Sequence, residues 1–109
     1  MTRYTVAIDV AAERDLDDIA TYIAGKDSID RAIEVASRID STIASLSTFP
    51  NRGAYPKELL DQGNREFREI HFKPYRIIYR VLVDKVVVVL IADGRRDMRA
   101  LLARRLLAA

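Results

Sequence analysis

The sequence contains no cysteine and a single histidine, His71, among its 109 residues. The lack of cysteine excludes disulfides, thiolate metal sites and a cysteine nucleophile. One histidine excludes a multi-histidine metal centre. No apolar run approaches the ~18 residues that a transmembrane helix needs. The N-terminal MTRYTVAIDV has Asp9 where a signal peptide would have a long apolar segment. We therefore expect a cytoplasmic protein with no metal site and no membrane partner.

Several catalytic signatures are also absent. There is no glycine-rich phosphate loop, no HExxH, no GxSxG and no calcium-binding loop, so no cofactor is expected. The composition is that of a globular protein, with 50% hydrophobic and 31% charged residues. A chain of this length builds its own core, and we expect one domain over residues 1–109.

The charge is unevenly distributed along the chain. Residues 1–64 hold 7 Lys/Arg and 11 Asp/Glu, a net charge of −4, whereas residues 65–109 hold 11 and 5, a net charge of +6. Most of the basic residues in the second part are arginines, whose planar guanidinium suits phosphate and carboxylate groups. A nucleic-acid backbone or an acidic protein segment would fit such a region. A solvated basic face is the alternative.

The first half of the chain has the pattern of one strand and two helices. Apolar and polar residues alternate over residues 4–10, which predicts a strand with one buried face. Apolar residues then recur at helical spacing over residues 16–23 and again over residues 29–46. Gly25 is expected to end the first helix, and Asp27 or Ser28 to cap the second. The two helices form a helical hairpin.

The second half predicts a loop, three strands and a last helix. Residues 50–64 are rich in Pro, Gly and Asn and form the loop, with room for one helical turn at 57–60. Strands are expected over residues 66–72, 75–83 and 86–92, and the seven apolar residues of the third predict a central strand covered on both faces. Asp97 caps the last helix. The fold class is therefore α+β, in the order β-α-α-β-β-β-α: a small antiparallel-dominated sheet packed against a helical hairpin, one layer of each, with a short C-terminal helix.

Three groups of basic residues are candidates for function. In FREIHFKPYRIIYR (67–80), arginines on adjacent strands can converge into a basic concavity; alternatively, Arg76 and Arg80 pair with Glu66 or Glu69 across the sheet. In GRRD (94–97), a strand end opens a helix, which favours an anion site; the alternative is a solvated turn. The last helix carries a third group, which we expect to be an ordinary polar face: Arg99, Arg104 and Arg105.

Two further features have a structural and a functional interpretation. His71 is the single imidazole that can transfer a proton near neutral pH, although a lone strand histidine is more often structural. The acidic run Asp15, Asp17 and Asp18 lies at the start of the first helix, where it stabilises the helix dipole.

Four segments in order resemble the RelE/ParE superfamily, the toxins of type II toxin–antitoxin systems. They are DLDDIATYIA (15–24), LSTFPNRG (46–53), FREIHFKPYRIIYRV (67–81) and VVVVLIADGRRD (86–97). The resemblance implies a bacterial or archaeal cytoplasmic toxin, neutralised by a co-encoded antitoxin, with a small sheet on a helical hairpin. It also leaves two activities open. ParE-like members poison DNA gyrase and block replication, whereas RelE-like members cleave mRNA in the ribosomal A site, so whether the chain is an enzyme stays open.

The RelE-like alternative requires a set of catalytic residues. The resemblance places Arg68, Arg76 and Arg95 or Arg96 at the family's basic positions, with His71 as a substitute proton-transfer group. A second basic residue expected two positions after Arg68 is replaced by isoleucine, and neither Tyr nor His follows the GRRD segment. The first helix and the REI strand are also more similar to ParE. We therefore favour a gyrase inhibitor over an mRNA interferase, and a member that only binds its antitoxin is the third possibility.

The same resemblance implies partners and binding residues. The antitoxin is expected to contact the outer surface of the hairpin and the sheet near the basic patch, with an acidic stretch that neutralises Arg76, Arg95 and Arg96. Operator DNA is expected to bind only through the antitoxin. The residues predicted to bind the target or the antitoxin are Arg68, Arg76, Arg80, Arg95, Arg96 and Arg99.

Overall fold

The computed structural model describes residues 3–107, so both ends of the predicted domain, residues 1–2 and 108–109, lie outside the described residues. One four-stranded sheet has the strand order β1-β4-β3-β2. β1 runs parallel to β4, and the other neighbours are antiparallel. The strands are β1 (Thr5–Ile8), β2 (Arg68–Phe72), β3 (Tyr75–Val81) and β4 (Lys85–Asp93). The helices are α1 (Val10–Lys26), α2 (Ile29–Ala44), α3 (Lys57–Leu60) and α4 (Met98–Leu102), with a 3₁₀ turn at Ser45–Ser47 and a π-helical turn at Ala103–Leu107.

The predicted order of elements and the α+β class are confirmed, and the bounds of several elements differ from the predicted ones. Gly25 does not end α1, which continues to Lys26. A glycine inside a helix costs only about 1 kcal/mol, so the helix continues through it. Of the two predicted caps for α2, Ser28 is the one used, because its hydroxyl accepts the backbone N–H of Arg31. β3 ends at Val81, two residues early, since the turn to β4 begins there.

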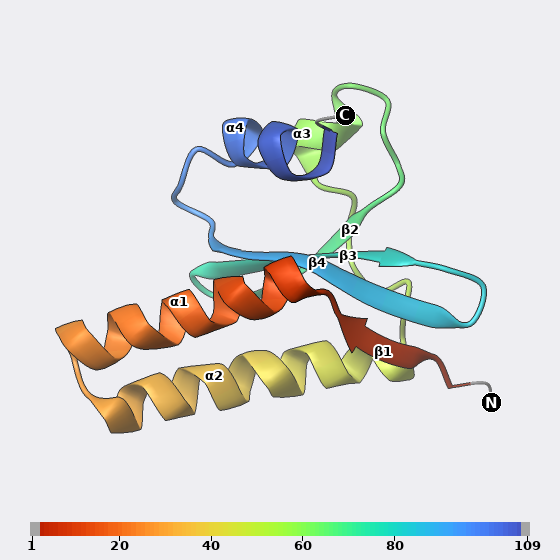
Figure 1. Cartoon of the computed structure of the whole chain (residues 1–109). Helices are drawn as coiled ribbons and strands as arrows, with labels where there is room; N and C mark the ends of the chain where they lie inside the picture. Colours follow the sequence, from red (N-terminus) through yellow and green to blue (C-terminus); the bar gives the residue numbers. More distant parts are fainter. Residues whose placement is uncertain (1–2, 108–109) are drawn as a thin grey trace.

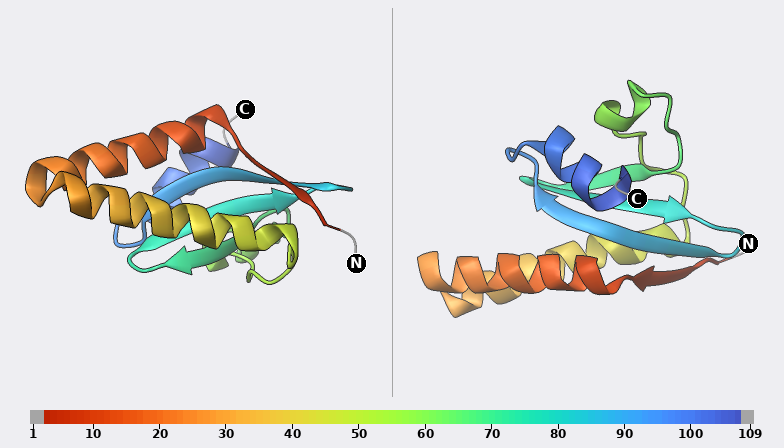
Figure 2. Two further views of the ribbon diagram at one scale, coloured as in Figure 1. Left: turned by 90° about the horizontal axis from the view of Figure 1, so that it is seen from below. Right: turned by 45° about the horizontal axis from the view of Figure 1, so that its top comes forward.

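Helices cover both faces of the sheet. The α1/α2 hairpin lies on one face, and α3 and α4 lie on the other (Figures 1 and 2). The expectation of a single helical layer was therefore incomplete. The short helices pack there because α4 has its own buried stripe of Met98, Leu101 and Leu102.

A β-bulge in β4 lets this one apolar strand contribute side chains to the cores on both faces of the sheet. Ile78 pairs with Leu90 but Tyr79 pairs with Val88, so β4 has one extra residue at this point. The bulge reverses which residues face each side of the sheet. Val86 and Val88, before the bulge, belong to the core under the hairpin, whereas Leu90 and Ala92, after it, belong to the core under α4. The seven-residue apolar run is thus the central strand that its composition predicted.

Buried Tyr79 fixes the loop that leads into β2. Its hydroxyl donates to the carbonyl of Pro50 at 2.8 Å and accepts the N–H of Gly53 at 3.0 Å. Gly53 leaves no room for a side chain, because an added Cβ would lie 2.5 Å from the carbonyl oxygen of Glu69. The loop therefore lies directly against β2, where Ala54 forms a bridge to Glu69.

Candidate functional site

The strand register sends the two central arginines to opposite faces of the sheet. Arg68 stands opposite Tyr79, whose side chain lies in the hairpin-side core. Arg76 stands opposite His71 and shares a face with Ile78, which lies in the core under α4. The predicted convergence of these arginines into one basic concavity is therefore wrong.

Arg76 is held by two carboxylates. Its guanidinium donates to both oxygens of Glu58 at 2.8 Å and to both oxygens of Glu69 at 2.6 and 3.1 Å. The Arg76 side chain is only 14% exposed. The predicted alternative, an ion pair with Glu69, is confirmed, and α3 contributes Glu58 as a second partner. A phosphate group would have to displace both carboxylates to reach this guanidinium.

The ion pair makes the stability of the protein depend on pH. Hydrogen bonds from Arg76 lower the pKa of Glu58 from 4.5 to about 2. A carboxyl group whose pKa is lower in the folded state stabilises the fold above its unfolded pKa, and this contribution is lost as the pH falls toward the folded value. We expect the free energy of unfolding to fall between pH ~4.5 and ~2, and to fall less steeply in Glu58→Gln. Urea unfolding at several pH values measures both slopes, and equal slopes would contradict the pairing.

His71 and Arg80 flank this cluster and also have acidic neighbours. His71 Nε2 lies 3.0 Å from Glu69 Oε1. Arg80 lies 3.9 Å from Glu66, and its guanidinium is 5.9 Å from the ring centre of Phe67. Both side chains are partly exposed. Arg76, His71 and Arg80 therefore each lie beside a carboxylate of the same chain.

Arg68 holds the loop before β2. It donates to the carbonyl of Gly53 at 2.8 Å and to the hydroxyl of Tyr55 at 3.2 Å. Its guanidinium also stacks on the Tyr55 ring at 4.5 Å from the ring centre. Carbonyls and a phenol leave the positive charge of Arg68 unneutralised, but its N–H groups already donate hydrogen bonds to the loop.

The GRRD segment is a turn with its own counter-ion. Arg95 donates to both oxygens of Asp93 at 2.9 and 2.6 Å, and these bonds lower the pKa of Asp93. Asp97 caps α4 by accepting the N–H of Ala100. Arg99 lies 3.4 Å from Asp61. Of the six arginines predicted to bind a partner, two have no acidic partner within residues 3–107: Arg68, whose hydrogen bonds go to carbonyls and a phenol, and Arg96.

A second ion pair was missed in the sequence. Arg105 donates to both oxygens of Asp15 at 2.9 and 3.0 Å. The same two side chains bond to the open edge of β4, where Asp15 accepts the N–H of Ile91 and Arg105 donates to the carbonyl of Val89. The edge is open because β1 pairs only as far as Val88. The predicted helix-dipole role of Asp15 is wrong, because α1 begins at Val10 and Asp15 lies beyond its first turn. Its carboxylate instead binds Arg105, which therefore does not belong to an ordinary polar face.

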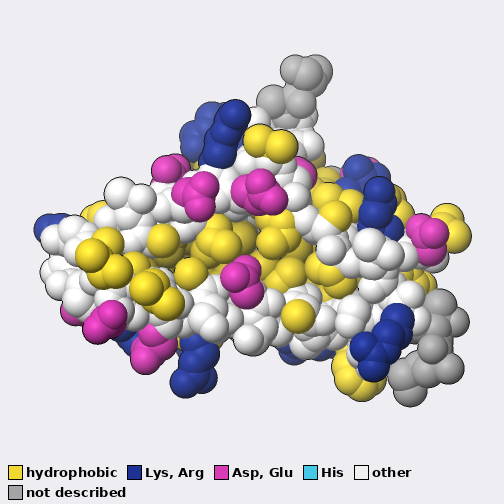
Figure 3. Space-filling model, turned by 60° about the horizontal axis from the view of Figure 1, so that its bottom comes forward, with side chains coloured by type: hydrophobic (Ala, Val, Ile, Leu, Met, Phe, Trp, Pro, Cys, Tyr) yellow, Lys and Arg dark blue, Asp and Glu magenta, His cyan; other side chains and the backbone are white. Residues whose placement is uncertain are grey.

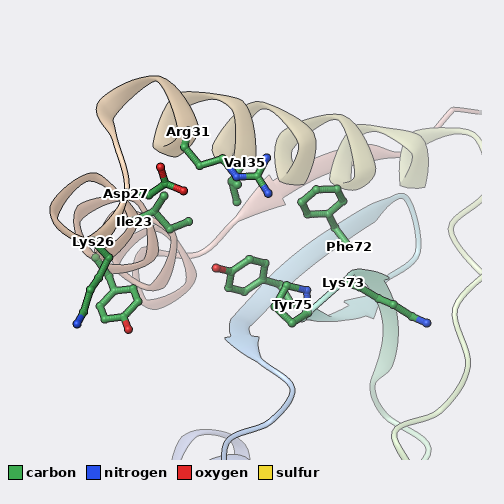
Figure 4. A pocket seen from close by; sticks show the side chains of 10 residues that line it. Ile23, Lys26, Asp27, Arg31, Val35, Phe72, Lys73 and Tyr75 are labelled. Carbon is green, nitrogen blue, oxygen red and sulfur yellow. The ribbon is translucent and has the colours of Figure 1, made fainter.

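Two hollows lie where the hairpin extends past the end of the sheet. Tyr22 and Tyr75 line both of them, and their volumes are about 190 and 410 Å³. In the smaller one, Arg31 and Val35 project from α2 toward the space that Phe72 and Tyr75 border (Figure 4). The larger one follows β4, and Asp15, Asp18 and Tyr22 of α1 line it. Sequence reasoning did not find these hollows, although Tyr22 carried a signal as an aromatic residue outside the apolar stripe of α1.

The described residues show neither a metal site nor a membrane-spanning helix. Within residues 3–107, no group of three or more His, Asp or Glu side chains is arranged to hold a metal ion. No helix in the same range has the length and hydropathy to cross a membrane.

Comparisons with known proteins give a consistent result. The family model for the ParE toxin of the type II toxin–antitoxin system parDE matches residues 6–98. Toxin ParE3 of Caulobacter vibrioides is 31% identical over 91 residues, which cover 84% of this chain and 87% of that toxin.

Solved structures share the fold at low sequence identity. A chain of the chromosomal ParDE system of P. aeruginosa superposes with a TM-score of 0.70 at 17% identity, covering 84% of this chain and 96% of its own. The toxin–antitoxin complex RelBE2 of Mycobacterium tuberculosis gives 0.61 at 19% identity, with 84% and 99% covered. A double arginine-to-alanine mutant of E. coli RelE gives 0.59 at 13% identity, with 91% and 92% covered.

Proposed function

Because this chain belongs to the ParE family of toxins of type II toxin–antitoxin systems, we propose that it inhibits DNA gyrase by binding it, without catalysing a reaction. A cognate antitoxin holds it inactive, and the antitoxin carries any contact with operator DNA. Toxin and target meet in the cytoplasm. The observation that carries the proposal is the closed ion pair of Arg76 with Glu58 and Glu69.

The ion pairing argues against RNA cleavage. Cleavage of a phosphodiester needs an activated 2′-hydroxyl, a stabilised phosphate charge and a protonated leaving oxygen. The mRNA interferase alternative would place Arg68, His71, Arg76 and Arg96 around one phosphate. Arg68 and Arg76 face opposite sides of the sheet, and the four bonds of Arg76 go to carboxylates. Arg76, the arginine of this set that stands opposite His71, is therefore not free to bind a phosphate.

We place the gyrase contact on the face that carries α4. Arg95, Arg96 and Arg99 lie there, at and just before the start of α4. Arg95 and Arg99 are well exposed in spite of their acidic neighbours. Exposed arginines at the rim of an interface accelerate association and add specificity.

Plasmid supercoiling by purified gyrase tests this function. We expect the free toxin to block supercoiling and to accumulate cleaved plasmid, and equimolar antitoxin to restore supercoiling. Arg96→Ala/Arg99→Ala should weaken inhibition about tenfold, whereas Lys85→Ala, an exposed base at the β3–β4 turn, is the matched control. Normal supercoiling at a large excess of folded toxin would overturn the proposal.

A further inference from the structure

Two tyrosines form a wall that the two hollows at the end of the sheet share. Tyr22 of α1 and Tyr75 of β3 line both of them. Tyr22 is 65% exposed, so its ring contributes little to either core. Tyrosine has an apolar body and a polar tip, and it is enriched among the residues that dominate binding energy at protein interfaces. The exposed ring of Tyr22 is therefore a candidate contact for a partner.

The smaller hollow has an apolar wall and a basic rim. Its charged lining residues are three bases and one acid: Lys26, Arg31, Lys73 and Asp27. Arg31 reaches over the space beside Tyr75 and Phe72, whereas Lys26 and Lys73 extend away from it (Figure 4). A net positive charge beside an apolar wall favours an occupant with an acidic group next to an apolar one.

Arg31 is available for such a contact. Its acidic neighbour is Glu34 on the same helix, and both side chains are about half exposed, so this ion pair contributes little. Burial and Asp93 raise the pKa of Tyr75, whereas Arg95 and Arg31 oppose the rise. Cations from α2 and from the GRRD segment therefore both act on the Tyr75 hydroxyl.

The larger hollow connects this wall to the arginines that we assign to gyrase. Arg95 and Arg96 line it, and so does Ile91 on the open edge of β4. The N–H of Ile91 points away from β3, toward Asp15. In an antiparallel pair the carbonyl of the same residue points the same way, so this hollow also offers a backbone acceptor.

The outer surface of the hairpin is a different face of the molecule. Hydrophobic side chains gather in a band along it (Figure 3), and we expect the antitoxin to cover that surface. The shared wall lies instead where the hairpin extends past the sheet and where β4 ends. Substitutions at the wall can therefore separate contacts with the target from contacts with the antitoxin.

We propose that the two hollows together bind one segment of gyrase, which packs an apolar or aromatic side chain against Tyr22 and Tyr75 and places an acidic side chain beside Arg31. The inference rests on the proposed function, since it takes gyrase as the partner. Arg95 and Arg96 line the larger hollow, and this continuity with the assigned contact favours the target over the antitoxin. Two adjoining hollows suit a segment of a protein chain better than one compact ligand.

Truncation of the exposed tyrosine tests the apolar part of the site. Fluorescently labelled toxin is titrated with purified gyrase. We expect Tyr22→Ala to bind about tenfold more weakly, and Tyr22→Phe, which keeps the ring, to stay within about threefold of wild type. The matched control is Phe49→Ala, because Phe49 is 60% exposed in the loop after α2. This control should stay within about twofold.

Charge reversal tests the acidic part of the occupant. Arg31→Glu and the control Lys85→Glu change the net charge equally, and Lys85 lies at the other end of β4 from the hollows. We expect Arg31→Glu to bind gyrase about tenfold more weakly at 50 mM salt and within about threefold of wild type at 500 mM. Lys85→Glu should stay within about twofold at both salt concentrations.

The same variants are titrated with the antitoxin, and each should bind it within about twofold of wild type. Wild-type gyrase affinity in both Tyr22→Ala and Arg31→Glu would overturn the inference and leave gyrase as the target. Loss of antitoxin binding with gyrase binding unchanged would also overturn it, by assigning the hollows to the antitoxin. A wild-type toxin that does not bind gyrase would overturn the proposed function and this inference together. Circular dichroism confirms that each variant is folded.

Discussion

Replacing Arg76 with alanine is expected to destabilise the protein by about 3–5 kcal/mol, because two buried carboxylates lose their counter-ion. The Glu58 and Glu69 side chains are only 10% and 9% exposed, so water does not replace the guanidinium. Urea unfolding of wild type and Arg76→Ala measures the difference. The substitution should also release α3, which Arg76 ties to the sheet through Glu58.

A triple variant separates the ion pair from other effects of the mutation. Arg76→Ala/Glu58→Gln/Glu69→Gln removes the charges together with the counter-ion, and we expect it to recover a large part of the lost stability. A catalytic arginine would behave differently, since its removal would abolish activity and leave stability almost unchanged. A loss of less than 1 kcal/mol in Arg76→Ala would contradict the structural role.

The second large effect is expected at Asp15. Asp15→Ala leaves the half-buried Arg105 without its carboxylate and the N–H of Ile91 without its acceptor. We expect a loss of about 2–3 kcal/mol. The amide of Ile91 should exchange its hydrogen faster, and the turn at Ala103–Leu107 should loosen, because Arg105 anchors it to the edge of β4.

Asp18 provides the matched control on the same helix. Its side chain is exposed, so Asp18→Ala should change stability by no more than about 0.5 kcal/mol. A double-mutant cycle with Arg105→Ala isolates the coupling between Asp15 and Arg105. Equal losses in Asp15→Ala and Asp18→Ala would contradict the pairing of Asp15 with Arg105 and with the edge of β4.

Local patterns predicted the elements of this fold. The alternation of β1 and the helical stripes of α1 and α2 each depend on neighbours within a few residues, and so do the caps at Ser28 and Asp97. The pairing of Arg76 with Glu69 could also be predicted, because a short turn between two strands fixes which of their residues lie close together.

Contacts between segments far apart in the chain could not be predicted from the sequence. Glu58 lies in the short helix α3, which has no register to the sheet, and Asp15 is 90 positions from Arg105. The extra residue of the bulge has no local signal, since any residue of a valine run can occupy it. These contacts decide which arginines are free, and that is why the predicted basic patch contained residues that are already paired.

The most direct test of the account is the fate of mRNA on programmed ribosomes exposed to the free toxin. We predict that the message stays intact at toxin concentrations that block gyrase, because Arg76, the arginine opposite His71, is already paired with Glu58 and Glu69. Cleavage of the message in the ribosomal A site, with gyrase unaffected, would contradict it and would make the chain an enzyme.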